Sequence, residues 1–420
     1  MSEEPTSSAA MISMIEESSA SSVPEEKRNL IKNFKICNAS DYQIVARSVL
    51  PKPLYEYLAS GTDDEQTLSE NESAFKNWYL RPRVMRPIGS ISTATMLFGQ
   101  KLSLPVFISP AGVHALCDEV HGECASARAA QKSCTLFGLS QHSTRSIEQV
   151  SSACAACQGD ANLWFQCYIL KDRDMTLRLV RRAVNAGYKG LFLTVDSVRF
   201  GYREADARNG WSALPAPHRL VNYDEEMIKQ QHAGLDKNSI YSGDEDAWDQ
   251  NTEKLFEQSP TWDDVRWLKE ACNDLPLIIK GILTAEDAIE AVNAGADGVM
   301  VSNHGGRALD GALAAIDALP EVVKAIANRV PVLMDSGVRR GSDVVKALAL
   351  GACAVGIGKP VFFALATGGE DAVVHLLQML QKEVEAAMAI CGIETVADIK
   401  PSMVSRHPYG SVTRYTRSML

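Results

Sequence analysis

Short apolar runs alternate with amphipathic, helix-like segments along the chain from residue 104 to residue 360. Each run is almost continuously apolar, which is typical of strands that are buried on both faces of a parallel sheet and joined by helices. Eight such units favour a closed (β/α)8 TIM barrel over an open doubly wound sheet. The expected strands are 104–110, 134–140, 163–169, 190–196, 275–281, 298–304, 330–336 and 354–360.

A glycine near the end of several expected helices supports the same rhythm. Gly187, Gly295 and Gly351 each stand between a helical segment and the next apolar run. Glycine adopts the left-handed conformation that ends many helices, so each is predicted to be a C-terminal cap.

Four stretches depart from the barrel pattern. Residues 1–33, rich in Ser, Glu and Ala, predict a disordered N-terminal tail, ahead of a barrel domain over 34–400 and a C-terminal tail over 401–420. An N-terminal helical extension begins at Ser40, where Ser40-Asp41-Tyr42-Gln43 has the spacing of a capping box. Residues 205–262 are polar and acidic, and predict a long insertion after the fourth strand, either a lid or a disordered segment.

Composition narrows the class of protein. The chain has 420 residues, 46% of them hydrophobic, and a formal net charge of −10. This acidity disfavours binding to nucleic acid or to an anionic membrane surface, and no apolar run is long enough to span a bilayer. The ten cysteines are scattered, which favours reduced thiols in an intracellular protein; no metal site is expected.

Polar residues follow most of the expected strands at their C-terminal ends. In a barrel these ends converge on one face, where the active site lies. Core strands have no packing reason to end in so many polar groups, so the whole set predicts a site. The candidates are Ser140, Gln141, His142, Gln166, Tyr168, Thr194, Asp196, Arg203, Lys280, Ser302, Asn303, His304, Arg307, Asp335, Gly358 and Lys359.

Two glycine-rich segments after the seventh and eighth strands indicate a phosphate site. Residues 335–341 and 356–359 lie where barrels commonly hold phosphate, with backbone N–H groups and a helix N-terminus facing the anion. Arg339 and Lys359 would add positive charge. Ordinary turns with solvated basic residues remain the alternative.

The spacing of His304 and Arg307 indicates acid–base chemistry on an anionic substrate. Neighbouring guanidinium groups disfavour the charged form of a histidine, whereas a carboxylate such as Asp196 favours it, a balance that suits a general base at neutral pH. Arg203 and Arg307 together suit a carboxylate, which guanidinium groups bind through paired hydrogen bonds.

These residues resemble a known family, the FMN-dependent L-2-hydroxy acid oxidases and dehydrogenases, typified by plant glycolate oxidase. The similarity runs from about residue 40 to about residue 393, and its most specific part is Ser302-Asn303-His304-Gly305-Gly306-Arg307-Ala308-Leu309-Asp310. The other matching segments, in order, are Tyr55-Glu56-Tyr57, Phe165-Gln166-Cys167-Tyr168, Leu193-Thr194-Val195-Asp196, Lys280-Gly281 and Gly337-Val338-Arg339-Arg340-Gly341. The resemblance implies FMN as cofactor and oxidation of a small L-2-hydroxy acid to the 2-oxo acid.

The resemblance also implies roles for the candidates. His304 takes the substrate hydroxyl proton, Asp196 supports the imidazolium, and Tyr168 hydrogen-bonds the reacting oxygen. Lys280 lies at the N1–C2 oxygen edge of the flavin and stabilises negative charge there. The expected substrate-binding residues are Tyr57, Arg203, Arg307 and His142. The expected cofactor-binding residues are Ala111, Ser140, Gln166, Thr194, Lys280, Ser302, Asp335 and Gly337, with Arg339, Gly358 and Lys359 at the phosphate.

Three positions depart from the common pattern of that family. His142 stands where glycolate oxidase typically has tryptophan, at the wall that contacts the substrate side chain. Gly112 replaces an alanine facing the flavin, so an activity like that of lactate 2-monooxygenase stays open. Lys359 replaces an arginine, which keeps the charge but loses the forked geometry.

Oxygen is the expected electron acceptor, with hydrogen peroxide as product. A fused haem domain would show a His-Pro-Gly-Gly-like segment, and a quinone-linked enzyme an apolar stretch within 205–262; the sequence has neither. A dehydrogenase with another acceptor and a non-redox phosphate-binding barrel remain the alternatives.

Assembly and location are the last expectations. The family resemblance implies that the protein forms a homo-oligomer, namely a tetramer. The chain ends in Ser418-Met419-Leu420, which is similar to the peroxisomal address Ser-Lys-Leu, and the N-terminal tail has neither secretory nor transit character. We therefore expect a peroxisomal enzyme, or otherwise a cytoplasmic one.

Overall fold

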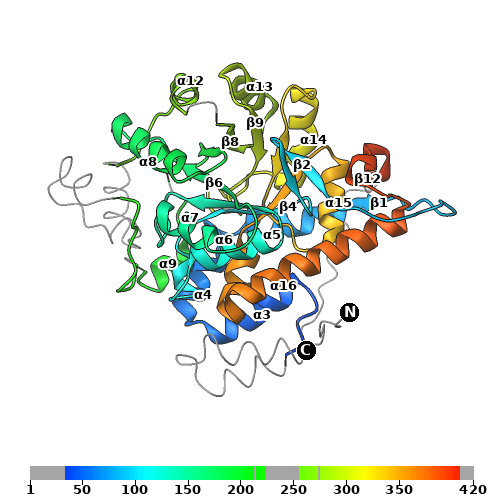
Figure 1. Ribbon diagram of the computed structural model, residues 1–420, viewed down its shortest axis with the longest axis horizontal. Helices are drawn as coiled ribbons and strands as arrows, with labels where there is room; N and C mark the ends of the chain where they lie inside the picture. The colour runs from blue at the N-terminus through cyan, green and yellow to red at the C-terminus, as the bar shows by residue number, and fades with distance from the viewer. Residues whose placement is uncertain (1–33, 200, 212–213, 224–254, 273–274, 407–420) are drawn as a thin grey trace.

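The computed structural model describes residues 34–199, 201–211, 214–223, 255–272 and 275–406. Within these residues, eight parallel strands close into a barrel surrounded by helices (Figure 1), which confirms the predicted TIM-barrel fold. The predicted tail over 1–33, the centre of the 205–262 insertion and the C-terminal tripeptide lie outside the described residues.

Each barrel strand falls within one of the predicted apolar runs or extends one residue beyond it. The first barrel strand, β4, pairs with both β5 and the last strand, β11, which closes the barrel. The strands are β4 (Val106–Ala111), β5 (Leu136–Ser140), β6 (Asn162–Cys167), β7 (Leu191–Thr194), β8 (Leu277–Ile282), β9 (Gly298–Val301), β10 (Val332–Met334) and β11 (Ala354–Ile357).

Helices surround the barrel, and further helices form the N-terminal extension. Those that follow the barrel strands are α6 (Glu123–Lys132), α7 (Ile147–Ala155), α8 (Arg173–Asn185), α9 (Glu204–Arg208), α12 (Trp262–Ala271), α13 (Ala285–Asn293), α14 (Ala315–Ile326), α15 (Gly341–Ala349) and α16 (Lys359–Cys391). The N-terminal extension contains α3 (Ala39–Val49), α4 (Lys52–Ala59) and α5 (Gln66–Ser73).

The inside of the barrel is filled by one large or medium side chain from nearly every strand. A short antiparallel hairpin, β2 (Thr95–Leu97) with β3 (Gln100–Leu102), adds Leu97 and Leu102 to this inner cluster and closes one end of the barrel. The cluster is therefore a packed core and not a pore. Its strand members are Phe107, Leu136, Trp164, Phe192, Ile278, Met300, Leu333 and Ala354.

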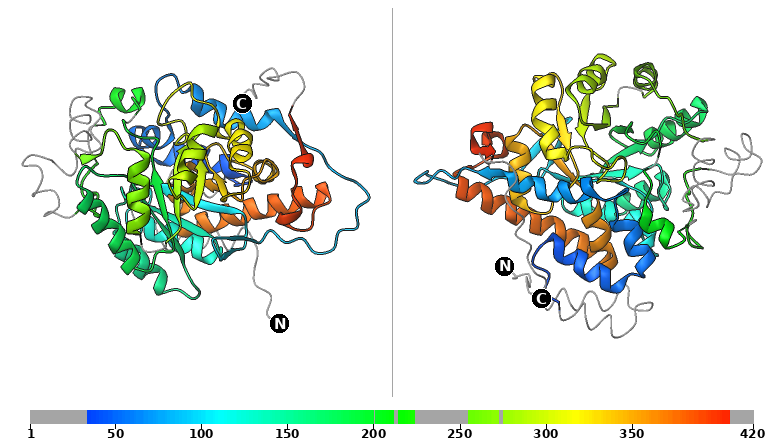
Figure 2. Two further views of the ribbon diagram at one scale, coloured as in Figure 1. Left: turned by 90° about the horizontal axis from the view of Figure 1, so that it is seen from above. Right: turned by 180° about the vertical axis from the view of Figure 1, so that it is seen from behind.

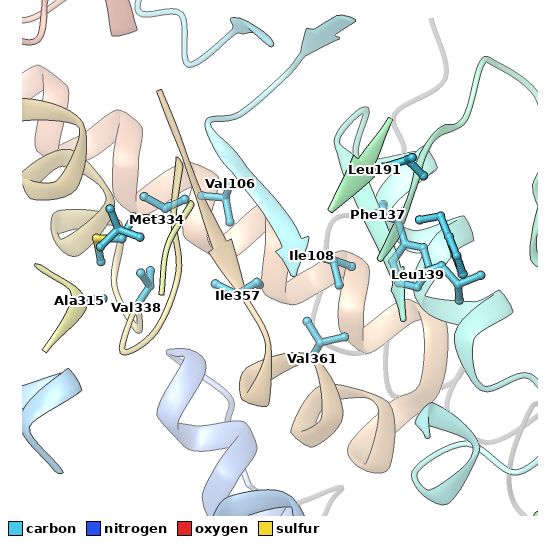
Figure 3. Packing of buried hydrophobic residues seen from close by; sticks show 14 of the residues in the cluster. Val106, Ile108, Phe137, Leu139, Leu191, Ala315, Met334, Val338, Ile357 and Val361 are labelled. Atoms are coloured by element: carbon cyan, nitrogen blue, oxygen red, sulfur yellow. The ribbon is translucent and has the colours of Figure 1, made fainter. Parts of the chain in front are cut away.

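The outward-facing strand residues pack on the helices. Figure 3 shows Ile108 of β4 and Ile357 of β11 close to Val361 of α16, with Phe137 and Leu139 of β5 nearby. All five side chains are almost completely buried. This outer layer fixes the helices against the strands and so fixes the loops that join them.

The N-terminal extension begins earlier than its capping box predicted. Asn38, not Ser40, is the N-cap of α3: its side chain accepts hydrogen bonds from the backbone N–H groups of Ser40 and Asp41. Asp41 completes the box by accepting from the Asn38 backbone. Asparagine at the N-cap can use its carbonyl oxygen in this way, so Ser40 lies in the first turn instead.

The C-terminal boundary also differs from the expectation. Residues 401–406 do not belong to a tail, because β12 (Val404–Arg406) pairs antiparallel with β1 (Trp78–Leu80). Backbone pairing with a strand far away in sequence leaves little pattern along the chain, so the sequence did not show it.

The three predicted glycine caps adopt the expected conformation. Gly187, Gly295 and Gly351 have φ values of 82°, 97° and 107°, and follow the last turns of α8, α13 and α15. These are left-handed values that other residues rarely adopt.

Helix α16 is long and apolar enough to cross a membrane by length and composition alone. It packs instead against α3, α6 and α15 (Figure 1) and buries residues such as Phe363 and Leu376. Gly368 and Gly369 have non-helical backbone angles, so the helix is kinked there. Its apolar side is a core face of this fold.

The cysteines agree with the expectation of reduced thiols. All ten lie in the described part of the chain, and all are free. Cys154 and Cys157, which form a C-x-x-C pair, stand at the end of α7 without a disulfide.

The segment between β1 and β2 extends away from the barrel (Figure 2). Its Val84 and Met85 side chains are 81% and 97% exposed. Both apolar side chains are therefore open to solvent in a single chain.

Candidate active site

The structure brings nearly all of the predicted site residues to one cavity at the C-terminal ends of the barrel strands. Asp196 and Ser302 lie directly behind its lining, in contact with His304 and Lys280. The predicted residues that line the cavity are Tyr57, Ala111, Ser140, His142, Gln166, Tyr168, Thr194, Arg203, Lys280, His304, Arg307, Asp335, Gly337, Arg339, Gly358 and Lys359.

The alternation of strand residues explains why the cavity floor is polar. Side chains two positions apart on a strand point to the same face. On most strands, the residue two positions after the one in the inner apolar cluster is polar. It also points into the barrel, and it lies near the C-terminal end of the strand, where active sites form. These positions are Ser109, Gln166, Thr194, Lys280, Ser302 and Asp335.

His304 and Asp196 form a hydrogen-bonded pair. The His304 Nδ1 atom lies 2.8 Å from Asp196 Oδ1, and Asp196 is only 8% exposed at its side chain. Ser197 lies beside the pair, with its Oγ 2.9 Å from the same carboxylate oxygen. With Nδ1 directed at the carboxylate, the other ring nitrogen of His304, Nε2, is left for the substrate.

Asp196 stays ionised although it is buried. Burial alone would raise the pKa of this carboxyl, but the His304 and Lys280 charges and the hydrogen bonds from His304 and Ser197 outweigh it and lower the pKa to about 2. A permanent negative charge at this position stabilises an imidazolium once the histidine takes a proton.

Both predicted arginines contact the ring of Tyr57. The guanidinium carbons of Arg203 and Arg307 stand 5.1 and 5.3 Å from the centre of its ring, both within cation–π range. The Arg203 Nε donates to Asp206 at 2.6 Å, and Arg307 Nη1 donates to the Tyr57 carbonyl at 2.8 Å. These contacts hold the two guanidinium groups side by side, an arrangement that suits a carboxylate.

An aromatic wall closes the side of the cavity near His142. The imidazole stacks on Tyr168 with ring centres 5.2 Å apart, and Phe256 meets both rings edge-on at 5.5 Å. Tyr223 lies 6.0 Å from the same imidazole. Burial, and then the His304 charge, lowers the pKa of His142 to about 3, so this ring is neutral at physiological pH.

Both ends of the insertion after β7 are attached to this wall. Tyr223 accepts a hydrogen bond from Gln141 at 2.6 Å, and Phe256 forms a β-bridge with Leu170. The described ends of the insertion therefore contribute directly to the pocket, although the sequence only indicated a long polar connection.

The floor of the cavity fits the expected flavin. Gln166 Oε1 accepts from Ser140 at 3.1 Å, whereas its buried Nε2 has no hydrogen-bond partner within the described residues. Such an atom carries a desolvation cost unless a ligand accepts from it. Lys280 is 3% exposed and donates to Ser302 at 3.0 Å, so a buried cation is available for the anionic edge of a reduced flavin.

The two candidate helix ends for the phosphate are not equivalent. At the start of α15, Asp343 accepts from the backbone N–H groups of Arg339 and Arg340, and Glu383 accepts from that of Gly341. The first turn of α16, after Gly358, has no side-chain cap. An uncapped helix N-terminus is the better anion site, so the first turn of α16 fits a phosphate better than the first turn of α15.

Arg339 and Lys359, the charged side chains expected at the phosphate, contact other protein groups in the structure. Arg339 forms an ion pair with Glu72 at 2.8 Å. Lys359 Nζ donates to the carbonyls of Ser60 and Gly305 at 3.1 and 3.0 Å. Burial, together with Arg307 and Arg339, lowers the pKa of Lys359 well below its usual value. The negative charge of a bound phosphate would oppose the effect of the two arginine charges on the pKa of Lys359.

Three non-glycine residues of the cavity lining have left-handed backbone angles. Val113, His304 and Ser336 have φ values of 61°, 57° and 75°. For the β-branched Val113 this conformation is strained. Strain of this kind persists where surrounding contacts hold a functional loop in place.

Buried polar residues outside the predicted set hold the site loops. Asn71 of α5 and Asn303 exchange two amide hydrogen bonds, of 2.8 and 2.7 Å. Glu123 accepts from the backbone N–H groups of His114 and Thr144, both at 2.9 Å, and so ties the loops after β4 and β5. Sequence reasoning missed Asn71 and Glu123, since neither follows a strand; Ser197, next to Asp196, could have been found.

Comparisons with known proteins identify relatives of this chain. The family model described as FMN-dependent dehydrogenase matches residues 46–406. Glycolate oxidase 1 of Oryza sativa is 42% identical over 387 residues, which cover 91% of this chain and 98% of that protein. A peroxisomal (S)-2-hydroxy-acid oxidase of the same species is 43% identical over 367 residues, with coverages of 87% and 95%. A structure of mandelate oxidase with (S)-4-hydroxymandelic acid has a TM-score of 0.78 at 36% identity, with coverages of 88% and 98%.

Proposed function

This chain belongs to the FMN-dependent dehydrogenase family, and from that premise we propose that it is an (S)-2-hydroxy-acid oxidase that passes its electrons to oxygen. It oxidises a small 2-hydroxy acid to the 2-oxo acid with FMN as cofactor, and hydrogen peroxide is the second product. The observation that carries the proposal is the His304–Asp196 pair beside two guanidinium groups, above the buried ammonium of Lys280.

In this proposal the substrate carboxylate binds between Arg203 and Arg307, next to Tyr57. His304 Nε2 then takes the proton of the C2 hydroxyl, and Asp196 stabilises the resulting imidazolium. Tyr168 is a phenol throughout, since burial and the Asp196 charge raise its pKa well above the usual range, and it donates a hydrogen bond to the reacting oxygen.

The chemistry supplied by bound FMN is the two-electron oxidation of the C2 carbon. The chain's part is to hold the ring and its phosphate. Gln166 Nε2 and Lys280 Nζ are buried donors for the ring. The other residues proposed to contact it are Ala111, Ser140, Thr194, Ser302 and Asp335. The first turn of α16 after Gly358, with Arg339, Lys359 and the Gly337 turn, would hold the phosphate.

A substrate panel on the purified protein tests the proposal. The protein should be yellow and should consume oxygen with at least one of glycolate, L-lactate, longer 2-hydroxy acids and L-mandelate. Turnover with an artificial acceptor but not with oxygen would make it a dehydrogenase. Oxidation with loss of carbon dioxide would make it resemble a lactate 2-monooxygenase, and a colourless protein that refuses FMN would favour a non-redox barrel.

His142 is the position at which we expect substrate choice to change. The neutral imidazole stacked on Tyr168 is smaller than the tryptophan common in glycolate oxidases, so it leaves more room for a substrate side chain. His142→Trp should shift the ratio of kcat/KM values toward glycolate and away from longer acids, by about 10-fold as for a pocket that loses the space of one or two methylene groups. Identical specificity in both forms would remove His142 from the pocket wall.

Location is a further part of the proposal. Peroxide formation suits a compartment that contains catalase, and a relative from Oryza sativa is named as peroxisomal. A fluorescent protein that ends in residues 411–420 should enter peroxisomes of a eukaryotic cell through Ser418-Met419-Leu420. Diffuse fluorescence, unchanged by deleting the tripeptide, would contradict this and leave a cytoplasmic enzyme.

We propose that the protein forms a homo-oligomer, a tetramer as the family resemblance implies. The exposed Val84 and Met85 side chains on the projecting segment support contact between copies. Light scattering of the purified protein tests this point.

A further inference from the structure

One small side chain next to the His304–Asp196 pair contacts each group in the proposed acid–base chemistry. Ser197 Oγ donates to Asp196 Oδ1 at 2.9 Å and lies 3.2 Å from His304 Nδ1. It also hydrogen-bonds the Tyr168 side chain. Ser197 lines the cavity together with His304 and Tyr168.

The single proton of the Ser197 hydroxyl decides how these contacts are arranged. The strongest acceptor nearby is the ionised carboxylate of Asp196, so the hydroxyl proton goes to Oδ1. A lone pair of Oγ then faces His304 Nδ1. Both neighbours of Nδ1, Asp196 Oδ1 and Ser197 Oγ, are acceptors in this arrangement.

A histidine nitrogen between two acceptors carries its proton. The neutral imidazole of His304 is therefore protonated at Nδ1, which leaves the lone pair of Nε2 for the substrate hydroxyl. In the other tautomer, the Nδ1 lone pair would face two acceptors. Nε2 would then carry the proton and could not accept one from the substrate hydroxyl.

The carboxylate depends on Ser197 for part of its own orientation. Asp196 Oδ2 is buried without a hydrogen-bond partner in the described residues, with the Lys280 ammonium 3.8 Å away. Asp196 is thus held through Oδ1, by His304 and Ser197 only. Removing the serine hydroxyl leaves His304 as the one hydrogen-bonded contact of the carboxylate among the described side chains.

We propose that Ser197 is a positioning residue that holds the Asp196 carboxylate in place and, through it, the Nδ1-protonated tautomer of His304. The inference rests on the proposed function, because it assigns Ser197 a part in the same proton transfer. Ser197 acts through Asp196 and His304 and needs no contact with substrate or FMN.

Two variants of equal shape test the role of the hydroxyl. Ser197→Thr keeps it, whereas Ser197→Val replaces it with a methyl group. In the FMN-loaded enzyme we expect kcat of the valine variant to fall about tenfold, as for the loss of one hydrogen bond to a charged group, with KM within about twofold of wild type. The threonine variant should stay close to wild type. Ser197→Ala is the second hydroxyl-free variant if valine prevents folding.

The tautomer itself gives a readout that a merely structural role would not move. Nitrogen-15 NMR of histidine-labelled holoenzyme distinguishes a protonated ring nitrogen from an unprotonated one, and a His304→Gln sample identifies the His304 signals. Wild type and Ser197→Thr should show Nδ1 protonated and Nε2 not, whereas Ser197→Val should show a mixture.

Equal kcat and the same tautomer in the threonine and valine variants would overturn the inference. Equal losses in both variants would also overturn it, since shape and not the hydroxyl would then be responsible. A wild-type protein that oxidises no 2-hydroxy acid would refute the proposed function instead, and the NMR comparison would still decide the role of Ser197.

Discussion

His304→Ala should lower kcat by roughly 10²–10⁴-fold, the contribution typical of a positioned general base. Within the cavity, His304 is the group whose Nδ1 is bonded to a buried carboxylate, so that Nε2 is presented as the base. Alanine removes both nitrogens and takes the imidazole away from Asp196, which keeps its hydrogen bond from Ser197. Steady-state oxygen consumption with the preferred substrate measures the loss.

A matched control separates this effect from loss of structure. His375 is also partly buried and also hydrogen-bonded through Nδ1, at 2.7 Å from the Tyr42 hydroxyl, but it stands on α16 away from the cavity lining. His375→Ala should keep kcat within about twofold, as expected for a site outside the chemistry. FMN absorbance should persist in both variants. Near-normal turnover in His304→Ala would remove this residue from the mechanism.

Arg307→Lys should lower kcat/KM by about 10–100-fold, since hydrogen bonds to charged groups contribute about 1.5–3 kcal/mol. One guanidinium nitrogen of Arg307 is engaged by the carbonyls of Tyr57 and Ser60, at 2.8 and 3.1 Å. Lysine has one nitrogen and cannot make these bonds while also binding a carboxylate in the forked geometry. The retained charge therefore rescues little.

Arg329→Lys serves as the control for this change of residue type. Arg329 also donates to backbone carbonyls, those of Ile326 and Ala325, but it lies beyond the end of α14. Its substitution should leave kcat/KM unchanged. If Arg307→Lys gave the same unchanged value, the carboxylate would have to bind elsewhere in the cavity.

The barrel could be predicted from the sequence because its strands are local, apolar and evenly spaced. The pattern that buries Val106 and Ile108 of β4 on one face also places Phe107 on the other, so the run is apolar throughout. Residues such as Lys280 could be found as candidates because they follow such runs, at the end of the strand that faces the site.

Features that depend on contacts between distant segments could not be predicted in this way. The two amides of Asn71 and Asn303 are 232 residues apart, and nothing near Asn71 marks it as part of a site. The expected phosphate site shows the same limit on prediction from sequence. The sequence offered two glycine-rich turns, and only the structure showed that Asp343 and Glu383 already satisfy the N–H groups of one of them.

The link between α5 and the loop after β9 has a consequence for biosynthesis. Asn71 leaves the ribosome long before its partner Asn303, and β4 long before β11, the strand that closes the barrel beside it. Until β11 has been translated, the nascent sheet keeps an open edge beside β4, and Asn71 lacks its partner until Asn303 has been made. The barrel therefore closes only after translation has delivered β11, and we expect the proposed activity to appear no earlier.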